Sequence, residues 1–319
     1  MDYNYYLPEG SLIHSHENLS YIRDLSGLER AMREDRILEA NAIMCDEECN
    51  LYVDLYGIRG FIPHDECVLT QNDEPIKDIA IITRVGKPVC FKVVAIESFG
   101  DTFRAILSRK KAQIECRSFY LSSLRPGDII PATVTHLDRF GAFVDIGCGI
   151  SSLLSIDCIS VSRISHPQDR LFNSQRLSVV VKSNDLESGR IYVTLKELLG
   201  TWEENASEFC IGQTVSGIVR SIESYGIFVE LAPNLAGLAE LKEENPLFNS
   251  IEIGDSISVY IKSILPDRMK IKLVLIDVNS YEAKPNPLRY FINTKETQHI
   301  DAFRYSPAKS SRIIETVFE

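Results

Sequence analysis

The chain has 319 residues, more than the roughly 100 to 200 residues of a usual domain, so its length predicts two or three domains. A composition of 45% hydrophobic, 25% charged and 9% aromatic residues excludes a wholly disordered chain and a fibrous repeat. No window reaches the run of about 18 apolar residues that a membrane helix needs, and the first residues lack the basic-then-apolar order of a signal peptide. We therefore expect a cytoplasmic protein with no membrane partner.

The charge balance varies along the chain. The formal net charge is −11, whereas a protein that bound nucleic acid by bulk attraction alone would be basic. Residues 120–200 carry 8 basic and 8 acidic side chains, but residues 201–278 carry 6 basic and 12 acidic ones. A polyanionic partner should therefore prefer the middle of the chain.

The 8 cysteines are too sparse for a disulfide scaffold, so we expect reduced thiols. Cys45 and Cys49 are the one close pair, and a zinc site would need a second Cys or His pair at compatible spacing. None follows in the sequence, which favours an acidic hairpin loop. We expect no metal and no cofactor.

Residues 1–34 form a polar leader in which one short helix is predicted. Ser26 and Glu29 have the Ser-x-x-Glu spacing of a capping box, which marks a helix start. His14 and His16 are residue types that bind metals, but they lie in this polar and flexible leader. We expect neither a metal site nor catalysis there.

Residues 35–118 contain five short segments with the composition of strands. They occur in the same order as the strands of two later repeats, which predicts a diverged copy of the same unit, although the aromatic-Gly-x-Phe motif of those repeats is missing. The segments are Arg36–Ala40, Asn50–Leu55, Gly60–Pro63, Val89–Val93 and Ala105–Lys110.

Residues 119–200 and 201–278 are two copies of one unit. Between residues 125 and 145, five residues are identical to those 85 positions later, and Phe140 is matched by Tyr225; the identical pairs are Gly127/Gly212, Val134/Val219, Gly141/Gly226, Phe143/Phe228 and Val144/Val229. Five or so short strands in about 75 residues are typical of a small closed barrel, which leaves no exposed sheet edge. The strands of the first of these copies include Ile129–Leu137, Ala142–Ile146, Leu177–Lys182 and Arg190–Leu195.

Two segments outside the repeats are predicted from weaker patterns. Residues 196–209 read as a linking helix, in which we expect Trp202 to be a packed spacer. Residues 279–319 form a C-terminal tail that the pattern does not assign, with Lys284-Pro285-Asn286-Pro287 near its start and a possible helix near Ser310–Phe318.

The motifs of the second copy resemble those of a known RNA-binding unit. They are Arg125-Pro-Gly-Asp, then the run from Arg139 to Gly147, and then Gly189-Arg190-Ile191 with Thr194–Leu198. This string resembles the S1 domain of the bacterial small-subunit ribosomal protein S1 family. The resemblance covers roughly residues 120–278 and extends weakly to 35–118.

The resemblance implies both a fold and a function. The expected fold is all-β with short linking helices, as three tandem five-stranded OB-fold barrels. The expected function is binding of single-stranded RNA, as messenger RNA, at the small ribosomal subunit during translation initiation. The family's leading domain often contacts the ribosome rather than RNA.

The expected site combines rings on which bases can stack with cations for the phosphates. The resemblance places Phe140, Phe143 and Arg190 at family contact positions, and Glu240 stands where it would repel a phosphate. The alternatives are that each ring belongs to a core and that each cation is a solvated surface charge. The full set of candidate residues is His136, Arg139, Phe140, Phe143, Arg163, His166, Lys182, Arg190, Tyr225, Phe228 and Lys262.

Catalysis finds little support, because the sequence has no phosphate-binding loop, no nucleophile elbow and no His-Glu-x-x-His pair. We therefore expect a binding protein that is not an enzyme and takes no small-molecule substrate. Two alternatives stay open. One is an RNA-binding regulator of RNA decay or a stress response that is not bound to the ribosome, because fold does not settle function. The other is an enzyme with its chemistry in the tail.

Overall fold

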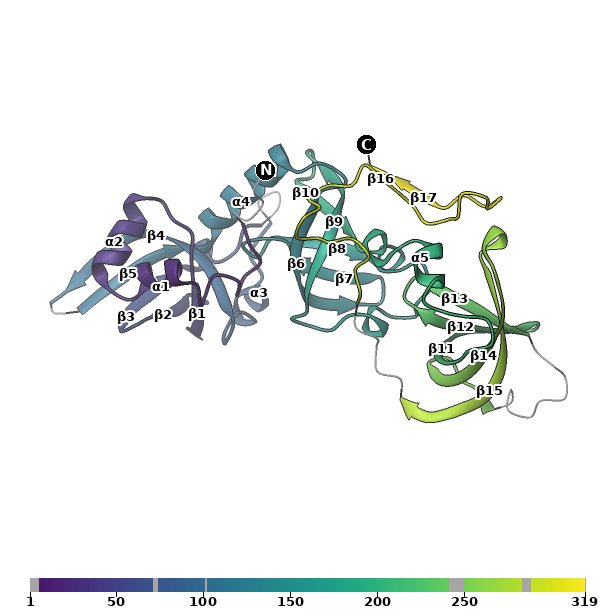
Figure 1. Ribbon diagram of the computed structural model, residues 1–319. Coiled ribbons are helices and arrows are strands. Elements are labelled where there is room, and N and C mark those ends of the chain that lie inside the picture. Colours follow the sequence, from purple (N-terminus) through teal and green to yellow (C-terminus); the bar gives the residue numbers. More distant parts are fainter. Residues whose placement is uncertain (1–5, 71–73, 101, 241–249, 283–287, 319) are drawn as a thin grey trace.

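Three closed barrels follow one another along the chain (Figure 1). The computed structural model describes residues 6–70, 74–100, 102–240, 250–282 and 288–318. Each barrel is a five-stranded sheet closed on itself, an arrangement that removes exposed sheet edges. The predicted fold class, all-β with short linking helices and three tandem five-stranded barrels, is confirmed.

The first barrel has the strand order β1-β2-β3-β5-β4. Its third and fifth strands run parallel, and its other neighbouring strands run antiparallel. The predicted segment Ala105–Lys110 ends too late, because the Ser108 hydroxyl accepts the N–H of Lys111 and begins a helix. The strands are β1 (Leu38–Cys45), β2 (Leu51–Leu55), β3 (Ile58–Ile62), β4 (Pro88–Phe99) and β5 (Thr102–Ser108).

The middle and third barrels repeat this topology, with one parallel pair in each. The middle barrel contains β6 (Ile129–Asp138), β7 (Gly141–Asp145), β8 (Ser151–Ser155), β9 (Arg176–Asp185) and β10 (Arg190–Thr194). The third contains β11 (Thr214–Glu223), β12 (Gly226–Ala232), β13 (Leu235–Glu240), β14 (Asp255–Leu265) and β15 (Lys270–Glu282).

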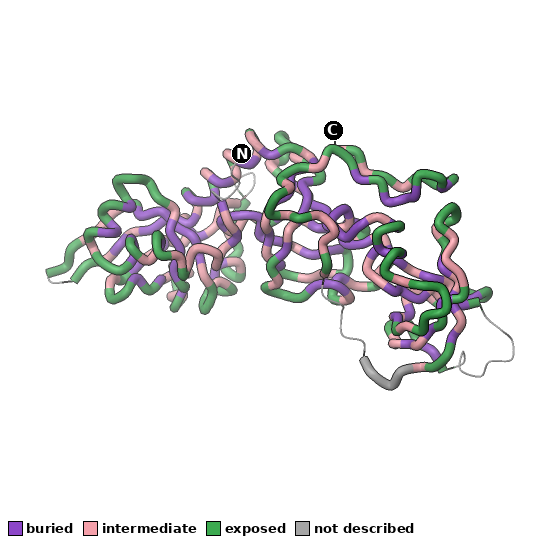
Figure 2. Tube along the Cα trace, viewed as in Figure 1, coloured by how far each residue is buried: buried purple, intermediate pink, exposed green. Residues whose placement is uncertain are grey.

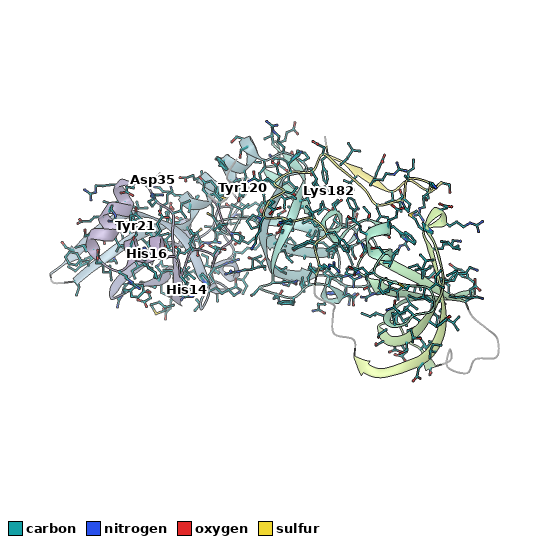
Figure 3. All side chains as sticks on the ribbon, viewed as in Figure 1. His14, His16, Tyr21, Asp35, Tyr120 and Lys182 are labelled. Atoms are coloured by element: carbon teal, nitrogen blue, oxygen red, sulfur yellow. The ribbon has the colours of Figure 1, made fainter. Side chains whose placement is uncertain are left out.

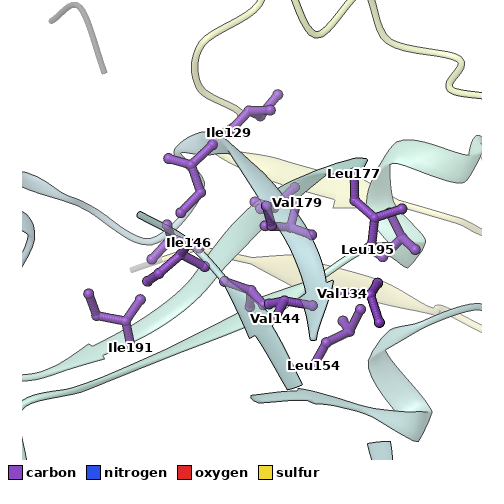
Figure 4. Close-up of a cluster of buried hydrophobic side chains, with 14 of the residues drawn as sticks. Ile129, Val134, Val144, Ile146, Leu154, Leu177, Val179, Ile191 and Leu195 are labelled. Carbon is purple, nitrogen blue, oxygen red and sulfur yellow. The ribbon is translucent and has the colours of Figure 1, made fainter. Parts of the chain in front are cut away.

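The core of the middle barrel is built from alternate residues of its strands. Side chains on a strand point to opposite faces in turn, so every second residue faces the barrel interior. Val134, Val144, Leu154 and Val179 come from four different strands, and each is at most 1% exposed (Figure 4). Figure 2 shows the same alternation of buried and exposed residues along the chain.

The leader contains two helices, α1 (His16–Ile22) and α2 (Leu25–Arg33), rather than one. The predicted capping box at Ser26 is wrong, because Asp24 is the N-cap of α2 and its carboxylate accepts the N–H of Gly27. His16 is the first residue of α1, and His14 lies just before it (Figure 3). The leader around these two histidines is therefore ordered.

The first link between barrels is α4 (Arg109–Ser123), which the sequence analysis did not predict. Tyr120 on this helix is fully buried, and its hydroxyl lies 2.6 Å from the carbonyl oxygen of Tyr6 and 3.0 Å from that of Ile146. The helix therefore joins the leader to the middle barrel. Within the described ranges, no helix is both long enough and apolar enough to cross a membrane.

The second link is a 3-10 turn, η5 (Lys196–Leu199), followed by α5 (Trp202–Ala206). The predicted single helix over 196–209 is wrong, because the chain turns at Gly200, whose φ of +83° ends the helical path. Trp202 is 2% exposed and belongs to the core of the third barrel. Its role as a packed spacer agrees with this position.

The C-terminal tail runs back across the middle barrel (Figure 1). The helix expected near Ser310–Phe318 is wrong, because β17 (Glu315–Val317) pairs there with β16 (Ala302–Arg304). The tail also bonds to the middle barrel, where Ile129 N–H donates to Gln298 and Ile300 N–H donates to Gly127. The segment Lys284–Pro287 lies outside the described residues.

Buried charges join the leader, the first barrel and the middle barrel. The carboxylate of Glu9 accepts Arg109 Nε at 2.7 Å and Nη2 at 2.9 Å, and it lies 3.5 Å from Arg84 Nη1. Asp145, at the end of β7, accepts the backbone N–H of Glu9 at 2.7 Å. A buried pair that lost one partner would leave an uncompensated charge, so this network resists separation of the two barrels.

A second buried network joins the middle barrel to the third. The guanidinium of Arg170 donates to Glu230 on β12, and Arg220 on β11 donates to the same carboxylate at 2.7 Å. Arg220 also lies 3.2 Å from Asp169. The side chains of Arg170 and Glu230 are each 3% exposed, so both charges are desolvated and paired.

Glu39 on β1 is a buried carboxyl whose ionisation affects stability. Burial, helped by the nearby carboxylates of Glu9 and Asp145, raises its pKa to about 7, although the N–H groups of Leu12 and Gly10 that bond to it act in the opposite direction. An unfolded glutamate has a pKa near 4.3. The protonated form is therefore favoured by folding, and stability is lost as pH rises through about 7.

We predict that Glu39→Gln flattens this pH dependence. The neutral amide cannot ionise, so between about pH 5 and 8 the variant should lose about 1–3 kcal/mol less stability than the wild type. Thermal unfolding of both proteins across that range measures the difference. Parallel stability curves for the two proteins would contradict the assignment.

Candidate RNA-binding face

Two phenylalanine rings meet at the β6–β7 turn of the middle barrel. Asp138 pairs with Gly141, so Arg139 and Phe140 occupy a tight two-residue turn. Phe140 is 51% exposed, and its ring lies 5.8 Å from that of Phe143 in an edge-to-face contact. The three-residue spacing would put the two rings on opposite sides of an ideal strand, but the turn brings them together.

Gly141 allows β7 to begin directly after this turn. A Cβ at this position would lie 2.5 Å from the carbonyl oxygen of Leu154 and 2.9 Å from the Cα of Ser155, on the neighbouring strand β8. No real Cβ tolerates such contacts. The glycine between the two rings is therefore required for β7 and β8 to pair at this point.

His136 extends the pair of phenylalanines to three rings. It lies opposite Phe143 in the β6–β7 ladder, and the two rings stack with centroids 6.3 Å apart and planes 24° apart. His136 is exposed and Phe143 is half-buried. Side chains that both face outward on neighbouring strands form a continuous ring surface, of the kind on which bases stack.

Arg190 stands at the start of β10, on the other side of β8 from β7. Its strand pairs in parallel with β8, where Tyr192 lies opposite Leu153, and Leu153 lies opposite Phe143. Arg190 is exposed and lies across from Asp185 on β9. We define the middle face as the four residues at the β6–β7 end of the barrel, together with the exposed arginine at the start of β10: His136, Arg139, Phe140, Phe143 and Arg190.

The other three candidates of the middle barrel, His166, Arg163 and Lys182, make contacts with residues other than the rings. His166 accepts the N–H of Gln168 through Nδ1 and so caps a 3-10 turn, η4 (Pro167–Asp169). Arg163 lines a cavity of about 430 Å³ between this barrel and the tail. Lys182 on β9, labelled in Figure 3, donates to the Cys158 sulfur at 3.3 Å.

The third barrel repeats the ring pair but with a different charge environment. Tyr225 is 58% exposed, and its ring meets Phe228 edge to face at 6.2 Å. Lys272 Nζ lies 2.9 Å from the carboxylate of Glu240, and this contact holds the pKa of Glu240 below its usual range. Lys262 is exposed on β14 and interacts electrostatically with the same carboxylate. Glu240 therefore offsets the cations near these rings.

The first barrel carries an aromatic cluster that the sequence analysis missed. Tyr52 on β2 lies opposite Phe61 on β3, and the two ring centroids are 5.3 Å apart. The guanidinium of Arg104 on β5 lies 5.2 Å from the centroid of the Phe61 ring. The aromatic-Gly-x-Phe motif could not find these residues, but the strand register does. We call Tyr52, Phe61 and Arg104 the first face.

No group of three or more His, Cys, Asp or Glu side chains in the described parts of the chain is arranged to hold a metal ion. Cys45 is the last residue of β1, and Cys49 lies in the loop between β1 and β2, where the acidic hairpin loop was predicted.

Comparison with known proteins identifies the middle unit. Residues 123–196 match the model of the S1 RNA binding domain. Over 250 residues the chain is 31% identical to the small ribosomal subunit protein bS1 of Leuconostoc lactis, with 74% of this chain and 54% of that protein covered. A bS1 homolog of Bacillus cereus is 33% identical over 234 residues, with 70% and 58% covered.

A longer match comes from the bS1 protein of Staphylococcus aureus, which is 28% identical over 301 residues, with 90% of this chain and 74% of that protein covered. The chain spans about half the length of the first relatives that it matches. The match to the domain model falls on the barrel that carries the middle face. The chain therefore belongs to the S1 family of RNA-binding domain proteins.

Proposed function

We propose that this protein binds single-stranded RNA, as messenger RNA, at the small ribosomal subunit during translation initiation, and that the middle face is its principal contact. The observation that carries the proposal is the run of three outward rings, His136, Phe143 and Phe140, with an exposed arginine at each side. Binding of RNA alone accounts for this arrangement, so we assign no catalytic role to these residues.

Stacking and phosphate contacts can together supply the affinity. Stacking of a base on an aromatic ring contributes about 1–3 kcal/mol, and it tolerates any sequence because every base has a flat face. Arg139 lies in the turn beside Phe140, and Arg190 lies beyond β8, so cations flank the rings. Bases on the rings would leave their phosphates within reach of these guanidinium groups.

The balance of charge supports the middle barrel over the third. Its segment carries equal numbers of basic and acidic residues, whereas residues 201–278 are strongly acidic. Glu240 beside Lys272 weakens the attraction of the third barrel for phosphates. We infer that Tyr225, Phe228 and Lys262 contribute less to RNA affinity than the middle face does.

The ribosomal assignment derives from the relatives. Three of the similar proteins are named small ribosomal subunit protein bS1 or a homolog of it. We propose the same association for this chain, because tandem barrels joined by buried charge networks suit a protein that holds RNA beside a large assembly. A cytoplasmic location follows from this proposed association.

We predict that Phe140→Ala combined with Arg190→Ala weakens RNA binding by about 10- to 100-fold, because it removes one stacking surface and one phosphate contact. Fluorescence anisotropy of the full chain with a pyrimidine-rich RNA of about 12 nucleotides measures this change. The matched control is Arg125→Ala, which removes an exposed arginine from the segment that precedes β6. An unchanged affinity of the double variant would contradict the proposed face.

We predict that the binding constant falls with salt at a log–log slope of about −2 to −3, since each phosphate contact contributes about −0.7 for a single strand. Arg190→Ala alone should make the slope shallower by about 0.7, and Arg125→Ala should leave it unchanged. Titrations at four salt concentrations give the slopes. Equal slopes for the wild type and Arg190→Ala would remove Arg190 from the site.

We predict that the purified protein sediments with isolated small ribosomal subunits in a sucrose gradient. The RNA-free protein alone should stay near the top of the gradient, which is the control. Retention of RNA binding without co-sedimentation would instead favour an RNA-binding regulator that acts away from the ribosome.

A further inference from the structure

We propose that the first barrel carries a second binding site for single-stranded RNA, formed by Tyr52, Phe61 and Arg104. The inference rests on the proposed function of the middle face, and it extends that function to a barrel without the corresponding sequence motif.

Strand register places Tyr52 where the middle barrel has Phe143. Tyr52 lies opposite Phe61, and Phe61 lies opposite Ile106 on the parallel strand β5. In the middle barrel, Phe143 is linked in the same way through β8 to Tyr192 on β10. Both rings are half-buried on the outer side of the second strand.

The same register aligns Arg104 with Arg190. Arg104 stands two residues before Ile106, as Arg190 stands two residues before Tyr192. Each arginine also has a carboxylate opposite it on the preceding strand, which is Glu97 in the first barrel and Asp185 in the middle one. The first face therefore reproduces both the ring and the arginine–carboxylate pair.

Ring contacts hold Arg104 in a fixed position. Its guanidinium lies 5.2 Å from the centroid of Phe61 and 5.1 Å from that of Phe99, within the range of a cation–π contact. Nε and Nη2 donate to Glu97 at 3.0 and 2.6 Å. Among the described residues Nη1 has no hydrogen-bond partner, so one donor group is free for a phosphate.

The charges around the first face favour stacking over phosphate contacts. Arg59 is exposed and lies beside Arg104 in the parallel ladder, but Asp54 lies opposite Arg59 and Glu97 pairs with Arg104. The loop that precedes β2 adds three acidic residues, 46–48. The first face should therefore bind RNA more weakly than the middle face and with less dependence on salt.

A weak second site matters most for long RNA. Once the middle face has bound one part of a strand, contact of the same strand with the first barrel is intramolecular, which raises its effective concentration. OB barrels occupy about 4–16 nucleotides each, so an RNA of about 30 nucleotides can reach both faces and one of about 8 can occupy only one.

The test is the double variant Tyr52→Ala with Arg104→Ala in the full chain, measured by fluorescence anisotropy with uridine-rich RNA. We expect affinity for RNA of about 30 nucleotides to fall by about 5- to 50-fold and affinity for about 8 nucleotides to be unchanged. Equal affinity of variant and wild type for the long RNA would overturn the proposal, and so would an equal loss for both lengths.

A matched control exists in the same barrel. Arg23 and Tyr56 form another exposed arginine–tyrosine pair, in which the guanidinium lies 5.7 Å from the ring centroid. Tyr56 lies at the β2–β3 turn. Arg23→Ala with Tyr56→Asn should leave both affinities unchanged; asparagine suits the positive φ of position 56. Thermal unfolding of each variant shows whether the first barrel stays folded.

Photocrosslinking gives a second measurement that needs no variant. Long RNA containing 4-thiouridine should crosslink to peptides that contain Tyr52 or Phe61 as well as to the middle barrel. Crosslinks confined to the middle barrel would overturn the second site and leave the proposed function intact. Absence of crosslinks at the middle barrel would instead contradict the proposed function.

Discussion

Backbone hydrogen bonds close each five-stranded sheet on itself, and this closure decides which side chains point into the core and which point outward. In a closed barrel, a strand's alternate residues must face the interior, so Ala142 and Val144 fill the core while Phe143 faces outward. The ladder then fixes which side chains on neighbouring strands lie beside that ring, and this places His136 next to Phe143. The outward rings are therefore a consequence of where the core residues must point.

The barrels are joined by buried charges rather than by simple linkers. Glu9 and Arg109 bind the leader to the first junction, and Glu230 accepts Arg170 and Arg220 at the second. Removing one partner would leave a desolvated charge, so each junction resists bending. Outward faces held at a fixed spacing can bind one long strand with a smaller loss of entropy than independent domains would need.

A repeated motif predicted the barrels and the ring pairs of the last two copies, because it aligned Phe140 with Tyr225 and Phe143 with Phe228. It could not find the first face, since Arg104 follows Gly100 by four residues and Arg190 directly follows Gly189. A longer β4–β5 hairpin causes this shift, and the alignment becomes visible only through strand pairing. That these faces bind RNA stays a prediction.

Other differences arise where tertiary contacts override local pattern. Asp24 caps α2 in place of Ser26, because its backbone is extended and its carboxylate reaches Gly27. The tail forms strands rather than a helix, because it bonds to residues far away in the sequence, such as Gly127. A Cβ at Gly127 would lie 2.2 Å from the carbonyl oxygen of Ile300, so this glycine admits the tail.

Recognition of single-stranded RNA through outward rings underlies the proposed function. The decisive measurement is a titration of the full chain with one RNA sequence of about 12 nucleotides, presented either as a free strand or annealed to its complement. Stacking on rings requires unpaired bases, so the account predicts micromolar or tighter binding of the free strand and much weaker binding of the duplex. Equal affinity for both forms, or no binding of either, would contradict it.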